Sequence, residues 1–184
     1  MKQPSLSHFG LLVAYVLPGF IVLAGLAPVF PAVANWLQPV DQGDLGIGPP
    51  VYALMAATAL GLILTCFRWV ILDHVHAYSG VRRPTWDDRQ LHDVLGGFDY
   101  LVQNHFRYYE FFGNAMVAGL FAYAVNRAAG SLPFLGPGTD LGMILITCVL
   151  FAASRDALGK YYSRTSRLIG QVSEKPRRPS DVRK

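Results

Sequence analysis

The chain has 184 residues, of which 52% are hydrophobic and only 15% carry a charged side chain, and its formal net charge is +4. A soluble domain of this length has about 25% charged residues, so the composition disfavours an ordinary water-soluble globule and excludes a disordered chain. The two cysteines are too few for a disulfide scaffold.

Four long runs of the chain contain no charged residue, and they cover 3–40, 45–67, 111–126 and 141–154. A helix needs about 20 mostly apolar residues to cross a bilayer core, and its backbone groups must be satisfied within the helix. The sequence therefore predicts an all-α polytopic membrane protein with one domain over 1–170. Its four transmembrane helices are expected at about 9–33, 50–72, 109–127 and 140–160.

The positive charges predict the orientation of these helices. Of the 16 lysines and arginines, all except Arg127 lie at the N-terminus, from Arg68 to Arg107, or from Arg155 onward, at the end of the fourth predicted helix and after it. Positive loops stay on the cytoplasmic side, so both termini and the segment 73–108 are expected in the cytoplasm, with the protein in the cell (inner) membrane. A cleaved signal peptide is the rival interpretation of the first helix, although its apolar run is longer than a signal peptide requires.

Small residues predict how the helices pack. Pro18 predicts a kink in the first helix, and Pro28 and Pro31 predict that its outer end frays. Small side chains four residues apart let helices approach closely, which predicts a tight bundle within one chain or in a homo-oligomer. The predicted packing residues are Ala57, Gly61, Asn114, Ala115, Ala118, Gly119 and Ala122.

The cytoplasmic segment between the second and third helices predicts an amphipathic helix. From Trp86 to Phe106 the apolar residues recur at the three- and four-residue spacing of one helix face. We expect this helix to lie on the inner membrane surface and to turn into the third span near Tyr108. A helical wheel places Glu110 on one flank of its apolar stripe and Arg107 on the opposite side.

Residues near the membrane surface predict contacts with lipid. Tyr109 and Tyr161, each beside another tyrosine, are expected to anchor span ends at the interface. Arg68 lies one turn inside the second span, where it is expected to snorkel to headgroups, with Asp73 neutralising it. The basic tail 171–184 is expected to be disordered. The residues predicted to bind anionic headgroups are Arg68, Lys160, Arg164, Arg167, Arg177 and Arg178.

Four of the five histidines lie in the cytoplasmic segment, and they suggest a site for chemistry. His74, His76 and His92 are the candidate catalytic residues. Asp88 and His92 are four residues apart and could reach one ion, while Asp73 could approach from the end of the second span. Together these residues could bind Zn or Fe. Because no standard metal-binding motif accompanies them, a solvated surface is the favoured interpretation.

These observations favour a non-enzymatic membrane module, without a cofactor, that oligomerises or anchors a cytoplasmic protein partner through its cytoplasmic face. The expected partners are the lipid bilayer and anionic lipid headgroups. The first alternative is a membrane-surface enzyme with a His/Asp site. The second is a pore or transport component formed between protomers, because one chain has few polar groups inside its spans. No nucleic-acid motif accompanies the positive charge, so no nucleic-acid partner is expected.

Overall fold

The computed structural model describes residues 10, 12–38, 47–86, 94–130 and 136–173, and every regular element among them is helical. The all-α class is confirmed for this part of the chain. The elements, with η marking a π-helical turn, are η1 (Leu12–Val16), α2 (Leu17–Leu26), α3 (Pro31–Leu37), α4 (Gly48–Tyr78), α5 (Leu95–Leu101), η3 (Val102–Phe106), α6 (Arg107–Ala129) and α7 (Pro137–Ser173).

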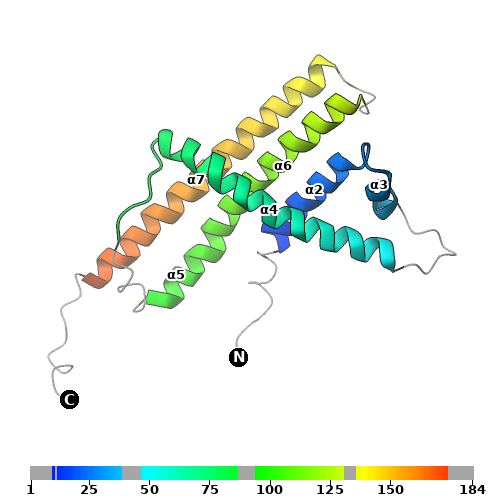
Figure 1. Cartoon of the computed structure of the whole chain (residues 1–184). Helices are drawn as coiled ribbons and strands as arrows, with labels where there is room; N and C mark the ends of the chain where they lie inside the picture. Colours follow the sequence, from blue (N-terminus) through cyan, green and yellow to red (C-terminus); the bar gives the residue numbers. More distant parts are fainter. Residues whose placement is uncertain (1–9, 11, 39–46, 87–93, 131–135, 174–184) are drawn as a thin grey trace.

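Two helices, α4 and the part of α7 up to Gly170, are long and apolar enough to cross a membrane. The 31 residues of α4 extend about 46 Å, which exceeds the roughly 30 Å of a bilayer core. In Figure 1, α6 and α7 run side by side in opposite directions, and α4 crosses α6. The predicted spans 50–72 and 140–160 lie within α4 and α7. The full four-span topology stays a prediction.

The first apolar run does not form the single helix predicted over 9–33. The wide turn η1 continues into α2, and a new helix, α3, begins at Pro31. Pro28 has no N–H group with which to continue α2. Phe30 is extended, at φ −118° and ψ 102°, as expected of a residue before a proline. Pro18 stands in the first turn of α2, directly after η1.

The predicted amphipathic helix is not a separate element. Instead, α5, η3 and α6 form one uninterrupted helical path, and the residues at its two junctions, Val102 and Phe106, keep right-handed helical angles. The prediction that the chain turns near Tyr108 is therefore wrong. A π-helical turn adds one residue to the regular helix, which a wheel of constant pitch does not anticipate.

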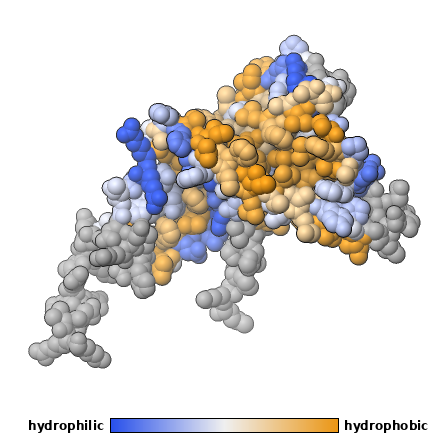
Figure 2. Space-filling view, in the orientation of Figure 1, coloured by the Kyte–Doolittle hydropathy of each residue, from blue (hydrophilic) through white to orange (hydrophobic). Residues whose placement is uncertain are grey.

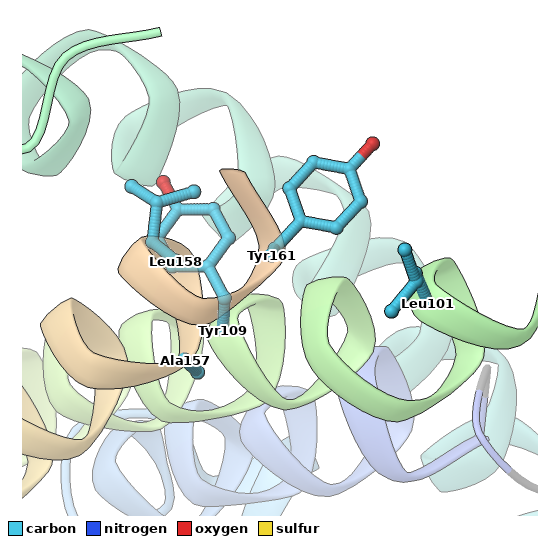
Figure 3. Close-up of a cluster of buried hydrophobic side chains, with 5 residues drawn as sticks. All are labelled: Leu101, Tyr109, Ala157, Leu158 and Tyr161. Carbon is cyan, nitrogen blue, oxygen red and sulfur yellow. The ribbon is translucent and has the colours of Figure 1, made fainter. Parts of the chain in front are cut away.

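A hydrophobic cluster joins α5 and the start of α6 to the C-terminal half of α7. Figure 3 shows its buried members, Leu101, Tyr109, Ala157, Leu158 and Tyr161. Tyr109 is 1% exposed and Tyr161 is 8% exposed, so the prediction that they anchor the protein at the membrane interface is wrong. Their rings pack against the neighbouring helix, where an aromatic side chain buries a large apolar area.

Glycine residues allow η1 and α2 to cross α4 closely. A Cβ atom built on Gly19 would lie 1.8 Å from the backbone oxygen of Ala57, and one on Gly61 would lie 2.1 Å from that of Tyr15. Only a residue without a side chain lets two backbones approach this closely. Such contacts associate helices in surroundings as apolar as their own side chains.

We expect Gly19→Ala to lower the melting temperature of the detergent-solubilised protein, because the added methyl group forces α2 away from α4 at a cost of about 1–3 kcal/mol. Gly142→Ala on α7 is the matched control, because a Cβ there meets no atom within 4 Å. Alanine also favours a helix over glycine by about 1 kcal/mol. Melts followed by circular dichroism should shift in opposite directions, and equal shifts would contradict this crossing.

Candidate functional site

Four charged side chains meet where η1, α4 and α6 come together, and we call them the ion network. Arg68 lies 3.6 Å from Asp73 and 3.7 Å from Glu110, measured between nitrogen and oxygen atoms. Arg107 lies 2.7 Å from Glu110. The side chains of Arg68 and Glu110 are 5% and 6% exposed. Because two arginines face two carboxylates, the ion network has no net formal charge.

Tyr15 connects the ion network to the first helix. Its hydroxyl donates to Glu110 Oε1 at 3.0 Å and accepts from Arg107 Nη1 at 2.9 Å. The same Nη1 also donates to Glu110 Oε2. Both oxygens of this carboxylate are therefore occupied by donors from the chain. Hydrogen bonds that involve a charged group are stronger than neutral ones, so this contact holds η1 against α6.

Tyr109 and Gly113 of α6 make the space that Arg68 fills. The Arg68 Cζ atom lies 4.5 Å from the centre of the Tyr109 ring, and the hydroxyl of that tyrosine donates to Asp73. A guanidinium over an aromatic face gains a cation–π attraction. A Cβ on Gly113 would lie 2.7 Å from the Arg68 Cδ atom. Glycine at 113 thus leaves room for the arginine stem.

The register of α4 directs Arg68 inward. Buried positions recur every three or four residues on one face of this helix, and Arg68 continues the stripe. The prediction that it snorkels to lipid headgroups is wrong, because a charge on this face is stable only if the protein pairs it. Asp73 does so, and Glu110 supplies a second carboxylate. The buried face of α4 consists of Ala53, Ala57, Gly61, Leu64, Arg68, Leu72 and His76.

Two further polar contacts tie the helices together. Asn114 of α6 donates to the backbone oxygen of Ala14 at 3.0 Å and to the Thr65 hydroxyl at 3.2 Å. His76 Nε2 shares a hydrogen bond of 3.1 Å with the Ser154 hydroxyl of α7. Asn114, His76 and Ser154 are all fully buried. These contacts, with the ion network, link η1, α4, α6 and α7.

The structure separates the predicted metal-binding and catalytic residues that it describes. His74 is exposed, His76 is buried against α7, and Asp73 belongs to the ion network. Residues two positions apart on a helix point in directions that differ by about 200° around its axis, so His74 and His76 face different sides. No three His, Cys, Asp or Glu side chains in the described ranges lie together as metal ligands do. Asp88 and His92 lie outside those ranges, so the Zn or Fe site stays a prediction.

The small residues predicted to pack helices lie at contacts within this one chain. A Cβ on Gly25 of α2 would lie 2.6 Å from Ala122 Cα, and one on Gly119 would lie 3.4 Å from the Met143 methyl group. The other five members of the predicted set are all buried, and they are Ala57, Gly61, Asn114, Ala115 and Ala118.

The residues predicted to bind headgroups differ in their surroundings. Lys160, Arg164 and Arg167 are exposed on the C-terminal half of α7, whereas Arg177 and Arg178 lie outside the described residues. Lys160 pairs with Asp156 at 2.6 Å, and Arg164 contacts η3. The Arg164 Nη1 atom lies 2.7 Å from the Nε2 atom of His105, on η3.

Sequence reasoning missed the role of Glu110, Arg107 and Tyr15. A usable signal was present, because an arginine inside an apolar span requires a counter-charge at its own depth. Glu110 directly precedes the third uncharged run, which places it at a depth comparable to that of Arg68. Tyr15 carried no such signal, since a tyrosine hydroxyl in an apolar run needs only some partner.

No family model, no curated protein and no solved structure matches this chain.

We expect Arg68→Met to lower the free energy of unfolding by about 3–5 kcal/mol, because it leaves Asp73 and the buried Glu110 with Arg107 as the one remaining cation of the ion network. Arg68→Met combined with Glu110→Gln restores charge balance and should cost less than the sum of the single changes. The control is Arg127→Gln, whose exposed pair with Asp140 (47% and 40% exposed) is worth less than about 1 kcal/mol. Denaturant unfolding in detergent gives the free energy of unfolding of both single variants, the double variant and the control. Equal losses of that free energy for Arg68→Met and Arg127→Gln would contradict a buried network.

His105 makes the contact between η3 and α7 sensitive to pH. Burial, together with the Arg164 and Lys160 cations, lowers the pKa of His105 below 6.5, and Asp156 opposes this shift. The neutral ring accepts the Arg164 hydrogen bond, which a protonated ring cannot. Because the unfolded chain binds this proton more readily, the contact is fully stable above about pH 6.5 and weakens as the pH falls toward the lower folded pKa.

His105→Gln keeps an acceptor but does not titrate. We therefore expect the melting temperature of the wild type to fall more than that of His105→Gln between about pH 7.5 and pH 5. An equal fall in both proteins would show that this histidine is not responsible.

Proposed function

We propose that the protein is a multi-pass protein of the cell (inner) membrane. It acts as a non-enzymatic anchoring module that presents a basic cytoplasmic face to anionic partners. The observation that carries the proposal is the separation of two kinds of charge. The charges of the ion network are buried or half-buried and are balanced, whereas the charges on the C-terminal half of α7 are exposed and mostly positive.

The apolar surface of the molecule supports a place in the membrane. Large hydrophobic side chains are exposed along α4, among them Leu62, Ile63 and Phe67, and along α7, among them Ile144 and Leu145. Figure 2 shows a broad apolar region over the middle of the face in view. A soluble monomer rarely exposes apolar patches of this extent, whereas lipid covers them without cost.

The directions of the helices support the predicted orientation. In Figure 1 the C-terminal ends of α4 and α7 and the start of α5 lie toward the left, while the start of α4, the end of α6 and the start of α7 lie toward the right. Hydrophilic side chains gather at the left end of the same view in Figure 2. The described parts of the segments expected in the cytoplasm, at the end of α4, in α5 and at the end of α7, therefore lie toward one side of this view, which supports the orientation that the positive-inside rule predicts.

The interior supports a structural role for the buried polar residues. Both oxygens of Glu110 accept hydrogen bonds from the chain, and Asp73 accepts from Tyr109. Groups held in this way fix the positions of helices. The small residues are also used inside the chain, so the proposal rests on the exposed basic face and not on self-association.

Membrane insertion and orientation are tested on the full chain. We expect the protein to stay in the membrane fraction after alkaline washing. Tags at both termini should be digested by a protease only in inside-out vesicles, and a tag between α6 and α7 only in right-side-out vesicles. This result is expected if four helices cross the membrane and both termini lie on the cytoplasmic side, together with the positively charged segments.

Two outcomes would contradict the proposal. Recovery of the chain in the soluble fraction, or termini on opposite sides, would overturn the topology. Stoichiometric Zn or Fe in the purified protein, lost on His74→Ala or His92→Ala, would instead support the membrane-surface enzyme.

A further inference from the structure

A cleft of about 420 Å³ lies along the C-terminal half of α7. Its floor includes Gly159 and Ser163, which are four residues apart and so share one face of the helix. Val81, from the segment after α4, contributes to its wall. The volume falls within the range of small-ligand sites, which is about 300–1,000 Å³.

The cleft is strongly positive. Arg155, Lys160, Arg164 and Arg167 line it, against the single acidic residue Asp156. Lys160 lies 2.6 Å from that aspartate, so one positive charge is balanced. Among the described residues, no carboxylate lies within ion-pair distance of the three arginines. A net charge of about +3 is thus gathered on little more than three turns of helix, which favours an anion.

Two of the three arginines are positioned by neutral groups. Arg155 donates to the hydroxyl and the backbone oxygen of Ser79, at 3.1 and 2.8 Å. Arg164 donates to the ring nitrogen of His105. A guanidinium has five donors, so each keeps donors for a ligand. Neutral partners fix the side chains without cancelling their charge, which prepares the cleft for the planar, paired hydrogen bonds of a phosphate group.

We propose that this cleft binds the phosphate group of an anionic phospholipid headgroup. This inference rests on the proposed function. The uncharged run of α7 ends at Ser154, and Arg155, the first residue of α7 that lines the cleft, follows directly. If α7 crosses the membrane, the cleft lies at the depth of the cytoplasmic headgroups. Basic pockets at this depth hold acidic headgroups.

Gly159 distinguishes a specific cleft from a generally positive surface. A Cβ built there meets no atom within 4 Å, so a larger side chain can be accommodated while it occupies the space of the ligand. A Gly159→Leu variant would therefore block the cleft without changing any charge. It complements the double variant Arg164→Gln with Arg167→Gln, which removes positive charge from the same cleft and leaves its space open.

The test uses the full chain purified in detergent and observed by native mass spectrometry. The probes are phosphatidylglycerol, phosphatidylcholine and inorganic phosphate. We expect one phosphatidylglycerol per chain to be retained in preference to phosphatidylcholine. Arg164→Gln with Arg167→Gln should weaken this binding by roughly tenfold to thirtyfold, and Gly159→Leu should weaken it as well. Displacement of the lipid by inorganic phosphate would show that free phosphate is also a source of the ligand.

The matched control is Arg82→Gln with Arg83→Gln, which removes the same charge from exposed positions that do not line the cleft. It should leave the retained lipid nearly unchanged. The inference is overturned if Gly159→Leu binds as the wild type does, or if Arg82→Gln with Arg83→Gln loses as much lipid as Arg164→Gln with Arg167→Gln. A protein absent from the membrane fraction would refute the proposed function instead, so the two failures are distinguishable.

Discussion

A guanidinium group inside an apolar helix has to be neutralised by the protein around it, and this requirement at Arg68 shapes the rest of the structure. The neighbouring turn supplies Asp73, and α6 supplies Glu110. Gly113 leaves space for the arginine stem, and Tyr15 brings the first helix to the same carboxylate. Helices that are apolar elsewhere are thereby held in one register, because any rotation of α4 would expose an unpaired charge.

The two π-helical turns lie beside this ion network. Tyr15 belongs to η1, and so does Ala14, whose backbone oxygen accepts a hydrogen bond from Asn114. The other turn, η3, ends immediately before Arg107. Wide turns of this kind often occur at functional sites, where they re-aim side chains. Here they flank the residues that meet the buried carboxylate, and the glycine contacts between the helices keep those residues close.

The sequence predicted what composition and local spacing determine. Long uncharged runs predicted helices where α4, α6 and α7 occur, and the five-residue spacing from Arg68 predicted Asp73 as its partner. Glu110 was not predicted, because it is 42 positions away and only tertiary packing brings it near. The break after α2 depends on the local backbone around Pro28. Tyr109 was wrongly predicted to lie at the membrane interface, because the sequence pattern of an aromatic residue at a span end is the same whether lipid or another helix covers it.

The ion network keeps the charge inside the protein balanced, and it forms only if α4 turns the face with Arg68 toward α6. Disulfide cross-linking in a chain without native cysteines tests this directly. Thr65 and Asn114 have side-chain atoms 3.2 Å apart, whereas Phe67 is exposed. The account predicts that cysteines at 65 and 114 cross-link readily and those at 67 and 114 do not. Cross-linking of the 67/114 pair alone would contradict it, because Arg68 would then face away from Glu110.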